Sequence, residues 1–77
     1  MPYTMKYTTD RDGWGGAVKS GESFTIIQYN SGPHSHSLKE HLVKIGREVR
    51  TSSSMGGGGL DVGEISKSNN WTIERIK

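Results

Sequence analysis

Three histidines lie close together in this sequence and are the side chains that most invite a chemical interpretation. His34 and His36 are separated by one residue, and His41 follows shortly after them. On an extended segment two such imidazoles lie on one side, about 6.6 Å apart along the strand. A third histidine one helical turn further on could then complete a zinc site. The alternative is that His34 and His36 are polar loop residues and that His41 lies on an exposed helix flank. Because that alternative needs no metal, we expect no cofactor.

A second candidate is the low-complexity segment 51–59, which reads Thr-Ser-Ser-Ser-Met-Gly-Gly-Gly-Gly. Glycines let backbone N–H groups approach an oxyanion closely. The P-loop pattern, however, ends in Gly-Lys-Ser/Thr and precedes a helix, whereas this segment lacks that ending and follows a predicted helix. We expect a flexible connector, with anion binding in some other geometry as the alternative.

Three cations form a basic flank on the predicted helix. Lys39, Arg50 and Arg47 fall between about 100° and 180° from Leu38 on a helical wheel. Together with the Ser/Gly segment this flank could contact phosphates, although cations near a helix C-terminus are also expected from the helix dipole. The candidate residues for binding a partner or a phosphate are Lys39, Arg47, Arg50, Ser52, Ser53, Ser54, Gly56 and Gly57.

The helix that carries these cations is predicted to begin at Ser37, because Ser37 and Glu40 match a capping box. Its apolar stripe, at helical spacing, consists of Leu38, Leu42, Ile45 and Val49. Arg47 and Arg50 are placed in its last turns. Gly46 falls inside this predicted helix at a cost of about 1 kcal/mol relative to alanine, so we expect it to face a closely packed neighbour.

The remaining elements are predicted to be strands, because their residues alternate between apolar and polar. The expected strands are residues 3–9, 14–19, 23–29, 60–66 and 71–76, and the last two form a hairpin closed by residues 68–70. The stretch 14–19 contains two glycines and makes a poor strand. The order β-β-β-α-β-β predicts an α+β fold, a small antiparallel sheet with one amphipathic helix packed on one face. Residues 1–77 form a single domain.

One sheet face lacks an obvious cover, because one helix cannot cover both faces. Ile27 and Tyr29 alternate with Phe24 and Ile26, so the two pairs lie on opposite faces. Exposed apolar patches with aromatic anchors mark protein interfaces. We therefore expect an interface that involves Ile27, Tyr29 and Trp14, and a homodimer is one way to cover it and the open sheet edges.

Composition limits the function further. The chain has 77 residues and no cysteine. No apolar run is long enough for a spanning helix, the first residues lack a secretory signal, and the lack of cysteine fits a reducing compartment. We therefore expect a cytoplasmic protein with no membrane partner. Ten basic residues against eight acidic ones and a pI near 9.1 are a weak indication of a polyanionic partner.

An enzyme is not expected, because catalysis needs converging titratable groups in a water-restricted pocket and this chain is too short to enclose one. The sequence predicts a small non-catalytic binding protein, an inhibitor or modulator that occludes or bridges a protein partner. Compact single-domain chains of this kind are a familiar form of inhibitor encoded by phages and mobile elements. The first alternative is a protein that binds nucleic acid, nucleotide or phosphate through its basic flank and Ser/Gly segment. The second is a metal-binding protein that uses the histidine cluster.

Overall fold

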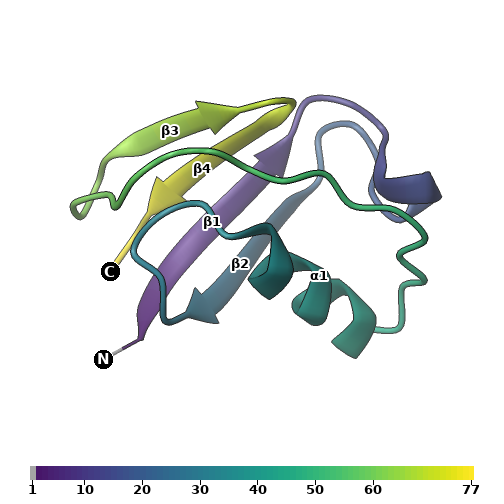
Figure 1. Ribbon diagram of the computed structural model, residues 1–77, viewed down its shortest axis with the longest axis horizontal. Helices are drawn as coiled ribbons and strands as arrows, with labels where there is room; N and C mark the ends of the chain where they lie inside the picture. Colours follow the sequence, from purple (N-terminus) through teal and green to yellow (C-terminus); the bar gives the residue numbers. More distant parts are fainter. Residues whose placement is uncertain (1) are drawn as a thin grey trace.

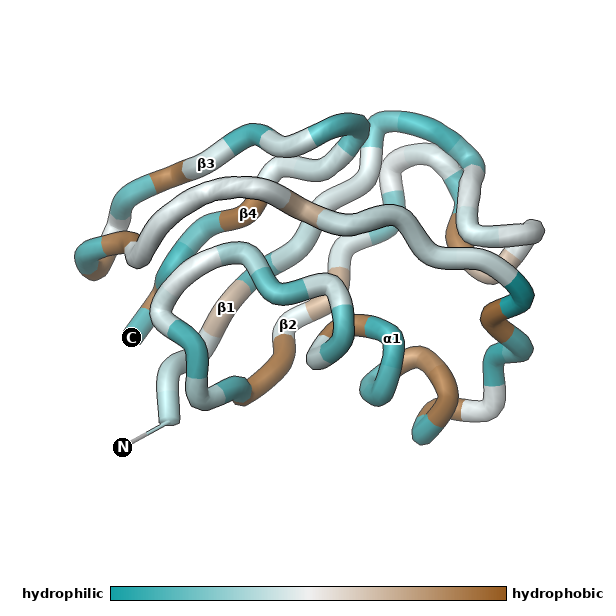
Figure 2. Tube along the Cα trace, viewed as in Figure 1, coloured by the Kyte–Doolittle hydropathy of each residue, from teal (hydrophilic) through white to brown (hydrophobic). Residues whose placement is uncertain are grey.

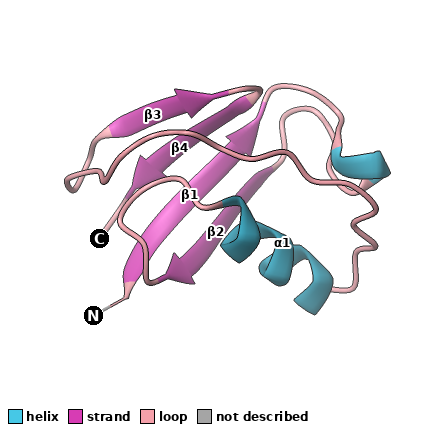
Figure 3. Ribbon diagram, viewed as in Figure 1, coloured by secondary structure: helices cyan, strands magenta, loops and turns pink. Residues whose placement is uncertain are grey.

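The computed structural model describes residues 2–77 and contains one antiparallel sheet and one helix (Figure 1, Figure 3). Its elements are β1 (Tyr3–Thr9), η1 (Trp14–Gly16), β2 (Ser23–Gln28), α1 (Ser35–Lys44), β3 (Ile65–Ser68) and β4 (Trp71–Arg75). The strand order is β2-β1-β4-β3, and every neighbouring pair is antiparallel. The predicted small α+β fold is confirmed.

The core lies on one face of this sheet. Met5 and Tyr7 of β1 are fully buried there, at 0% exposure, because alternate residues of a strand share a face. Helix α1 packs against β2. The chain that follows it, residues 45–64, crosses the sheet to reach β3 (Figure 1). We call it the return segment; its Met55 and Leu60 pack against the core. One sheet face is therefore covered jointly by α1 and the return segment.

The opposite face of the sheet is open at its β2 end. Phe24 and Ile26 are buried, whereas Ile27 is 72% and Tyr29 81% exposed. The hydropathy colours mark the apolar end of β2 (Figure 2). The predicted division of these four residues between two faces is confirmed.

Residues 14–19 do not form the predicted strand. Trp14, Gly15 and Gly16 all have positive φ, at 54°, 68° and 92°, and form the short turn η1. The glycines tolerate that conformation, while the Trp14 ring, 6% exposed, packs 5.3 Å from the ring of Trp71. Only an isolated bridge between Gly13 and Val18 remains of the expected strand. Within residues 2–77 the sheet therefore has four strands, one fewer than the predicted five.

The hairpin near the C-terminus is confirmed, but its first strand is shorter than predicted. The turn falls at Asn69 and Asn70, between β3 and β4. Residues 60–64 do not pair with β4 as a strand. Instead, Leu60 donates its backbone N–H to Ser31 O at 2.9 Å, and Gly63 has a positive φ of 87° in a turn. Gly63 and Glu64 still bond through their backbone to Arg75 of β4, at 2.8 and 3.1 Å. The turn therefore begins next to β3, and the strand does not extend back to Leu60.

The helix begins earlier than the capping box predicts, at Ser35. His34 is the N-cap, and its side chain Nδ1 accepts a hydrogen bond from the Ser37 backbone N–H at 3.3 Å. Glu40 does not reach back to Ser37, because its carboxylate pairs with His36 at 2.6 Å. The cap is therefore an imidazole rather than the predicted serine hydroxyl.

The helix also ends earlier than predicted, at Lys44. Gly46 has a φ of +92° and donates its N–H to Val43 O at 3.0 Å, and Arg47 donates its N–H to Leu42 O at 2.9 Å. These two bonds are those of a Schellman motif, which terminates a helix at a left-handed glycine. The expected close neighbour of Gly46 is absent, since a Cβ there would meet nothing within 4 Å. Arg47 and Arg50 therefore lie beyond the helix, and Ile45 is 50% exposed.

A buried hydrogen-bond network joins the sheet to the start of the helix. The Tyr7 hydroxyl donates to Gln28 Oε1 at 2.5 Å and accepts from the His34 backbone N–H at 3.0 Å. Gln28 Nε2 in turn donates to the backbone oxygens of Asn30 and Gly32 at 2.8 and 2.7 Å. Burial raises the pKa of the Tyr7 hydroxyl. The network fixes the loop between β2 and α1, and so positions the helix.

Replacing Tyr7 with phenylalanine is expected to lower the free energy of unfolding by about 1–3 kcal/mol, because Gln28 and the His34 N–H lose their buried partner. Urea unfolding measures this change. The matched control is Tyr29→Phe, at a side chain 81% exposed, which should change stability by less than about 0.5 kcal/mol. Equal effects of the two substitutions would contradict the role of the network.

Replacing Gly46 with alanine should destabilise the protein by about 1 kcal/mol, because alanine is strained at positive φ. Gly58→Ala is the control, since its Cβ would enter open space and no positive φ is involved; it should be nearly neutral. Thermal unfolding of both variants provides the comparison. A neutral Gly46→Ala variant would mean that the helix does not end at this residue.

Candidate functional site

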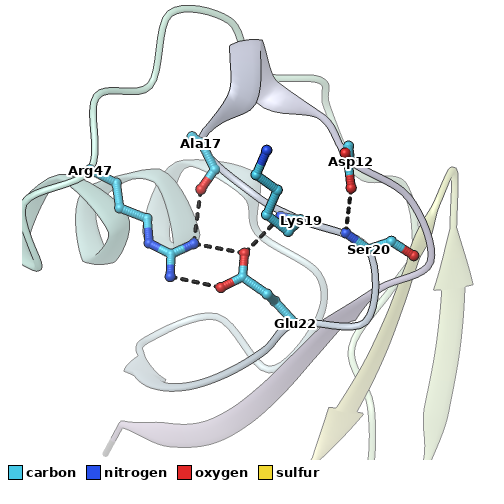
Figure 4. Close-up of polar contacts among 6 residues, drawn as sticks. All are labelled: Asp12, Ala17, Lys19, Ser20, Glu22 and Arg47. Carbon is cyan, nitrogen blue, oxygen red and sulfur yellow. Dashed lines mark hydrogen bonds and ion pairs between the residues drawn. The ribbon is translucent and has the colours of Figure 1, made fainter.

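Arg47, a predicted partner-binding residue, is engaged in an ion pair inside the fold (Figure 4). Its guanidinium donates two hydrogen bonds to the Glu22 carboxylate, at 2.8 and 2.7 Å, and a third to Ala17 O at 2.9 Å. It also lies 5.1 Å from the centroid of the Phe24 ring. Glu22 additionally accepts the Lys19 backbone N–H at 2.7 Å. Arg47 thus ties the return segment to the start of β2.

The Arg47 guanidinium holds the pKa of the Glu22 carboxyl well below its usual range, at about 2. The Lys19 N–H acts in the same direction, and the burial of the carboxyl opposes both. The pair also raises the pKa of Arg47. Because bidentate, charge-assisted hydrogen bonds are among the strong ones, a phosphate would have to compete with Glu22 for this guanidinium.

The other predicted cations do not converge on one site. Lys39 is exposed on α1. Arg50 is 72% exposed and lies 3.4 Å from the Glu48 carboxylate. Arg47 and Arg50 do line one open hollow of about 510 Å³ beside η1, but Lys39 does not. The structure therefore brings two of the three cations together, each beside an acidic side chain.

The Ser/Gly segment 51–59 crosses the molecule without secondary structure and makes several hydrogen bonds. Ser53 Oγ accepts the Trp14 indole N–H at 3.4 Å, and Ser54 O accepts the Asn69 side-chain amide at 2.8 Å. The Gly56 N–H donates to Ser68 Oγ at 2.8 Å. These bonds run to the η1 turn and to the hairpin; the flexibility of the segment stays a prediction.

The remaining candidates of this segment also lie away from the cations. Ser52 lines a hollow of about 320 Å³ beside Trp14 and Trp71. A Cβ at Gly57, whose φ is +132°, would meet Pro33 and Ser66 at 3.2–3.3 Å. Gly57 is thus packed against Pro33 and Ser66, whereas Gly56 and Gly58 border open space.

The three histidines have three different surroundings. His34 caps α1, and its Nδ1 also lies 2.6 Å from Ser37 Oγ. His36 pairs with Glu40, and the ring of His41 meets that of Phe24 edge-on at 6.4 Å. No group of three histidine, cysteine, aspartate or glutamate side chains among residues 2–77 could hold a metal ion.

A third hollow lies between β2 and α1 and has a volume of about 620 Å³. We call it the β2–α1 groove. On the β2 side it is lined by Ile27 and Tyr29, the exposed residues that the sequence singled out, together with Thr25, Ile26, Gln28 and Asn30. On the helix side it is lined by His34, His36, Ser37, Glu40, His41 and Lys44. Trp14, the third predicted interface residue, is buried in the core and does not reach this surface.

The backbone of β2 leaves hydrogen-bonding groups free along this groove. Thr9 donates its N–H to Glu22 O at 3.0 Å and accepts the Gly21 N–H at 2.8 Å. The backbone groups of Thr9 therefore face β2, and because alternate residues of a strand bond to the same neighbour, every second residue of β1 does so too. With the observed register, the β2 residues whose backbone groups face β1 are Phe24, Ile26 and Gln28. The N–H and C=O groups of Thr25 and Ile27 therefore point away from the sheet, because β2 is an edge strand.

The two edges of the sheet differ in how they are protected. Edge strands are commonly blunted by shortness, charge or proline. β3 has four residues and carries Lys67, whereas β2 has six residues, Ser-Phe-Thr-Ile-Ile-Gln, with no charge and no proline. The edge of β2 is therefore the one that is open to a further strand.

The sequence predicts the exposed residues on the β2 side of the groove but not the residues on its helix side. Ile27 and Tyr29 follow from strand alternation. The helix wall, with Glu40 and Lys44, could have been found only from the direction in which α1 leaves β2, and that direction depends on the buried Tyr7 network.

Comparisons of the chain with protein-family models, with curated proteins and with solved structures give no match. Among the described residues, no helix has the length and apolar character needed to cross a membrane. The function proposed below therefore rests on the geometry of this chain.

The Arg47–Glu22 pair predicts a specific response to acid. Because the folded-state pKa of Glu22 is lowered from 4.5 to about 2, its contribution is complete above pH 4.5 and is lost as the pH falls through about 2. Both side chains are about 30% exposed (32% and 28%), so solvent screening limits the contribution to about 1–2 kcal/mol. Glu22→Gln should lower the free energy of unfolding by this amount at pH 7. On acidification, the free energy of unfolding of this variant should fall by less than that of the wild type.

Urea unfolding between pH 7 and pH 2 measures both effects. The control is Glu48→Gln, which removes an exposed pair with Arg50 and should cost no more than about 0.5 kcal/mol. Identical acid profiles for the wild type and Glu22→Gln would show that the pair does not stabilise the fold.

Proposed function

We propose that this chain is a small non-catalytic binding protein that modulates a protein partner by docking through the β2 edge. The observation that carries the proposal is the exposure of Ile27 and Tyr29, at 72% and 81%, beside an edge strand with unpaired backbone groups. Tyrosine is enriched in the energetically important centres of protein interfaces. An exposed apolar pair at an unprotected edge is the feature of this surface that most needs a partner.

The surroundings of the ionisable side chains support binding rather than catalysis. Glu22 and Arg47 are occupied with each other, His34 caps the helix, and His36 pairs with Glu40. General acid–base catalysis needs such groups directed at a substrate, whereas these groups are engaged with other groups of the same chain. We propose a cytoplasmic site of action, which the absence of cysteine fits.

Affinity capture from nuclease-treated native lysate tests this proposal. The wild-type protein is expected to retain one stoichiometric protein partner, and the double variant Ile27→Ser/Tyr29→Ser should weaken retention at least about tenfold, because interface anchors commonly contribute 1–2 kcal/mol or more each.

The matched control is Ile65→Ser, since Ile65 is also exposed, at 59%, but lies on β3 at the far end of the sheet. It should retain the partner as the wild type does. Loss of all captured material on nuclease treatment would favour nucleic-acid binding instead. Equal retention by the double variant and the wild type would place the interface elsewhere.

A further inference from the structure

The β2–α1 groove has the features of a site for an added strand, and this inference rests on the proposed function. We infer that the partner contributes an extended, acidic segment that pairs with β2 as a fifth strand and lies against α1. Addition of a strand to a sheet edge is a recurring mode of peptide recognition, in which backbone bonds supply affinity and side-chain contacts supply specificity.

The backbone of β2 supplies the hydrogen bonds. Thr25 and Ile27 direct their N–H and C=O groups away from β1, and no backbone bond to another part of residues 2–77 uses them. In an antiparallel pair, alternate residues exchange both bonds with the residue opposite. An added strand would therefore make four bonds with Thr25 and Ile27. At about 3.3 Å per residue, the six residues of β2 offer an edge roughly 20 Å long.

The β2 side of the groove offers apolar contacts. On the open sheet face, Ile27 and Tyr29 are two residues apart, so an added strand would place alternate side chains beside them. The helix side is lined by polar side chains, among them Ser37, Glu40 and Lys44. In Figure 1, α1 begins beside the outer side of β2 and runs away from that strand, so the start of the helix borders the place of a fifth strand.

Charge indicates the composition of the segment. The helix wall carries one carboxylate, Glu40, which already pairs with His36 at 2.6 Å. Lys44 lines the same groove, is exposed, and has no acidic partner among residues 2–77. His41 adds an imidazole ring to this wall. An acidic side chain on the added strand would pair with Lys44, whereas a basic one would face an unpaired cation.

The probe for this inference is the acetylated, amidated peptide Thr-Val-Glu-Val-Glu-Val-Thr, added to the full-length protein labelled with ¹⁵N. Its control is the same peptide with both glutamates replaced by lysine. At about 90% saturation the acidic peptide should slow hydrogen exchange of the Thr25 and Ile27 amides about tenfold, because exchange then occurs from the unbound fraction. The lysine peptide should bind at least about threefold more weakly, and the difference should shrink at high salt.

A backbone variant separates strand addition from side-chain contact. Thr25→Pro removes one outward N–H, which an edge strand tolerates, and should abolish protection at Ile27; Thr25→Val keeps the N–H and should bind as the wild type does. If Thr25→Pro fails to fold, N-methylation of the central valine of the peptide removes a donor on the other strand and should have the same effect.

Three results would overturn the inference. They are an absence of protection at about 1 mM peptide, equal binding of the two peptides, and amides of Thr25 and Ile27 that are already protected in the free protein because a second copy occupies the edge. These results test the added strand and leave the proposed protein-binding function to its own experiment. A partner that depends on Ile27 and Tyr29 but is retained equally by Thr25→Pro would leave the protein-binding function standing without the added strand.

Discussion

The arrangement of this small protein depends on one buried hydroxyl. Tyr7 lies in the strand next to the edge, and its oxygen links the Gln28 side chain to the backbone of His34. Gln28 is 3% exposed and would be costly to bury without these bonds. Through Asn30 and Gly32 the same amide shapes the loop that leads into α1. The direction of the helix, and with it the groove between α1 and β2, follows from this network.

The sequence predicts the strands well where alternation is regular and poorly where glycine interrupts it. β1 and β2 carry clean alternating patterns, and their buried and exposed faces agree with prediction. Around Trp14 the two glycines indicate a break, but the left-handed turn arises because the indole packs onto Trp71, a contact far along the chain. The C-terminal end of the helix differs from the prediction for a local reason. A glycine just after the last helical turn is a common terminating signal. The apolar residues that continue at helical spacing beyond Gly46 predicted a longer helix instead.

The candidate site was predictable only in part. The β2 side of the groove follows from local strand alternation, whereas the helix side depends on contacts between residues far apart in the sequence. Exposure of Ile27 and Tyr29 follows from strand period and from the presence of a single helix. The roles of Arg47 and His34 do not, since each depends on a partner that no local pattern identifies: Arg47 reaches a glutamate 25 residues earlier in the chain, and the His34 imidazole takes the place of the expected serine cap. Arg47, which the sequence offers for phosphate binding, therefore has a structural partner in Glu22.

The unequal edges of the sheet also limit how this chain can assemble. A fibril grows without end only if each unit offers two compatible strand edges. Here β2 is an edge strand without charge or proline. In contrast, β3 is short and carries Lys67, and Gly56 of the return segment bonds to Ser68 at the end of that strand. A chain that is joined to another through β2 leaves only its β3 edge exposed, and that edge is poorly suited to pair with a further strand. One exposed edge of this kind, on one side of the sheet, favours a closed complex over an open polymer.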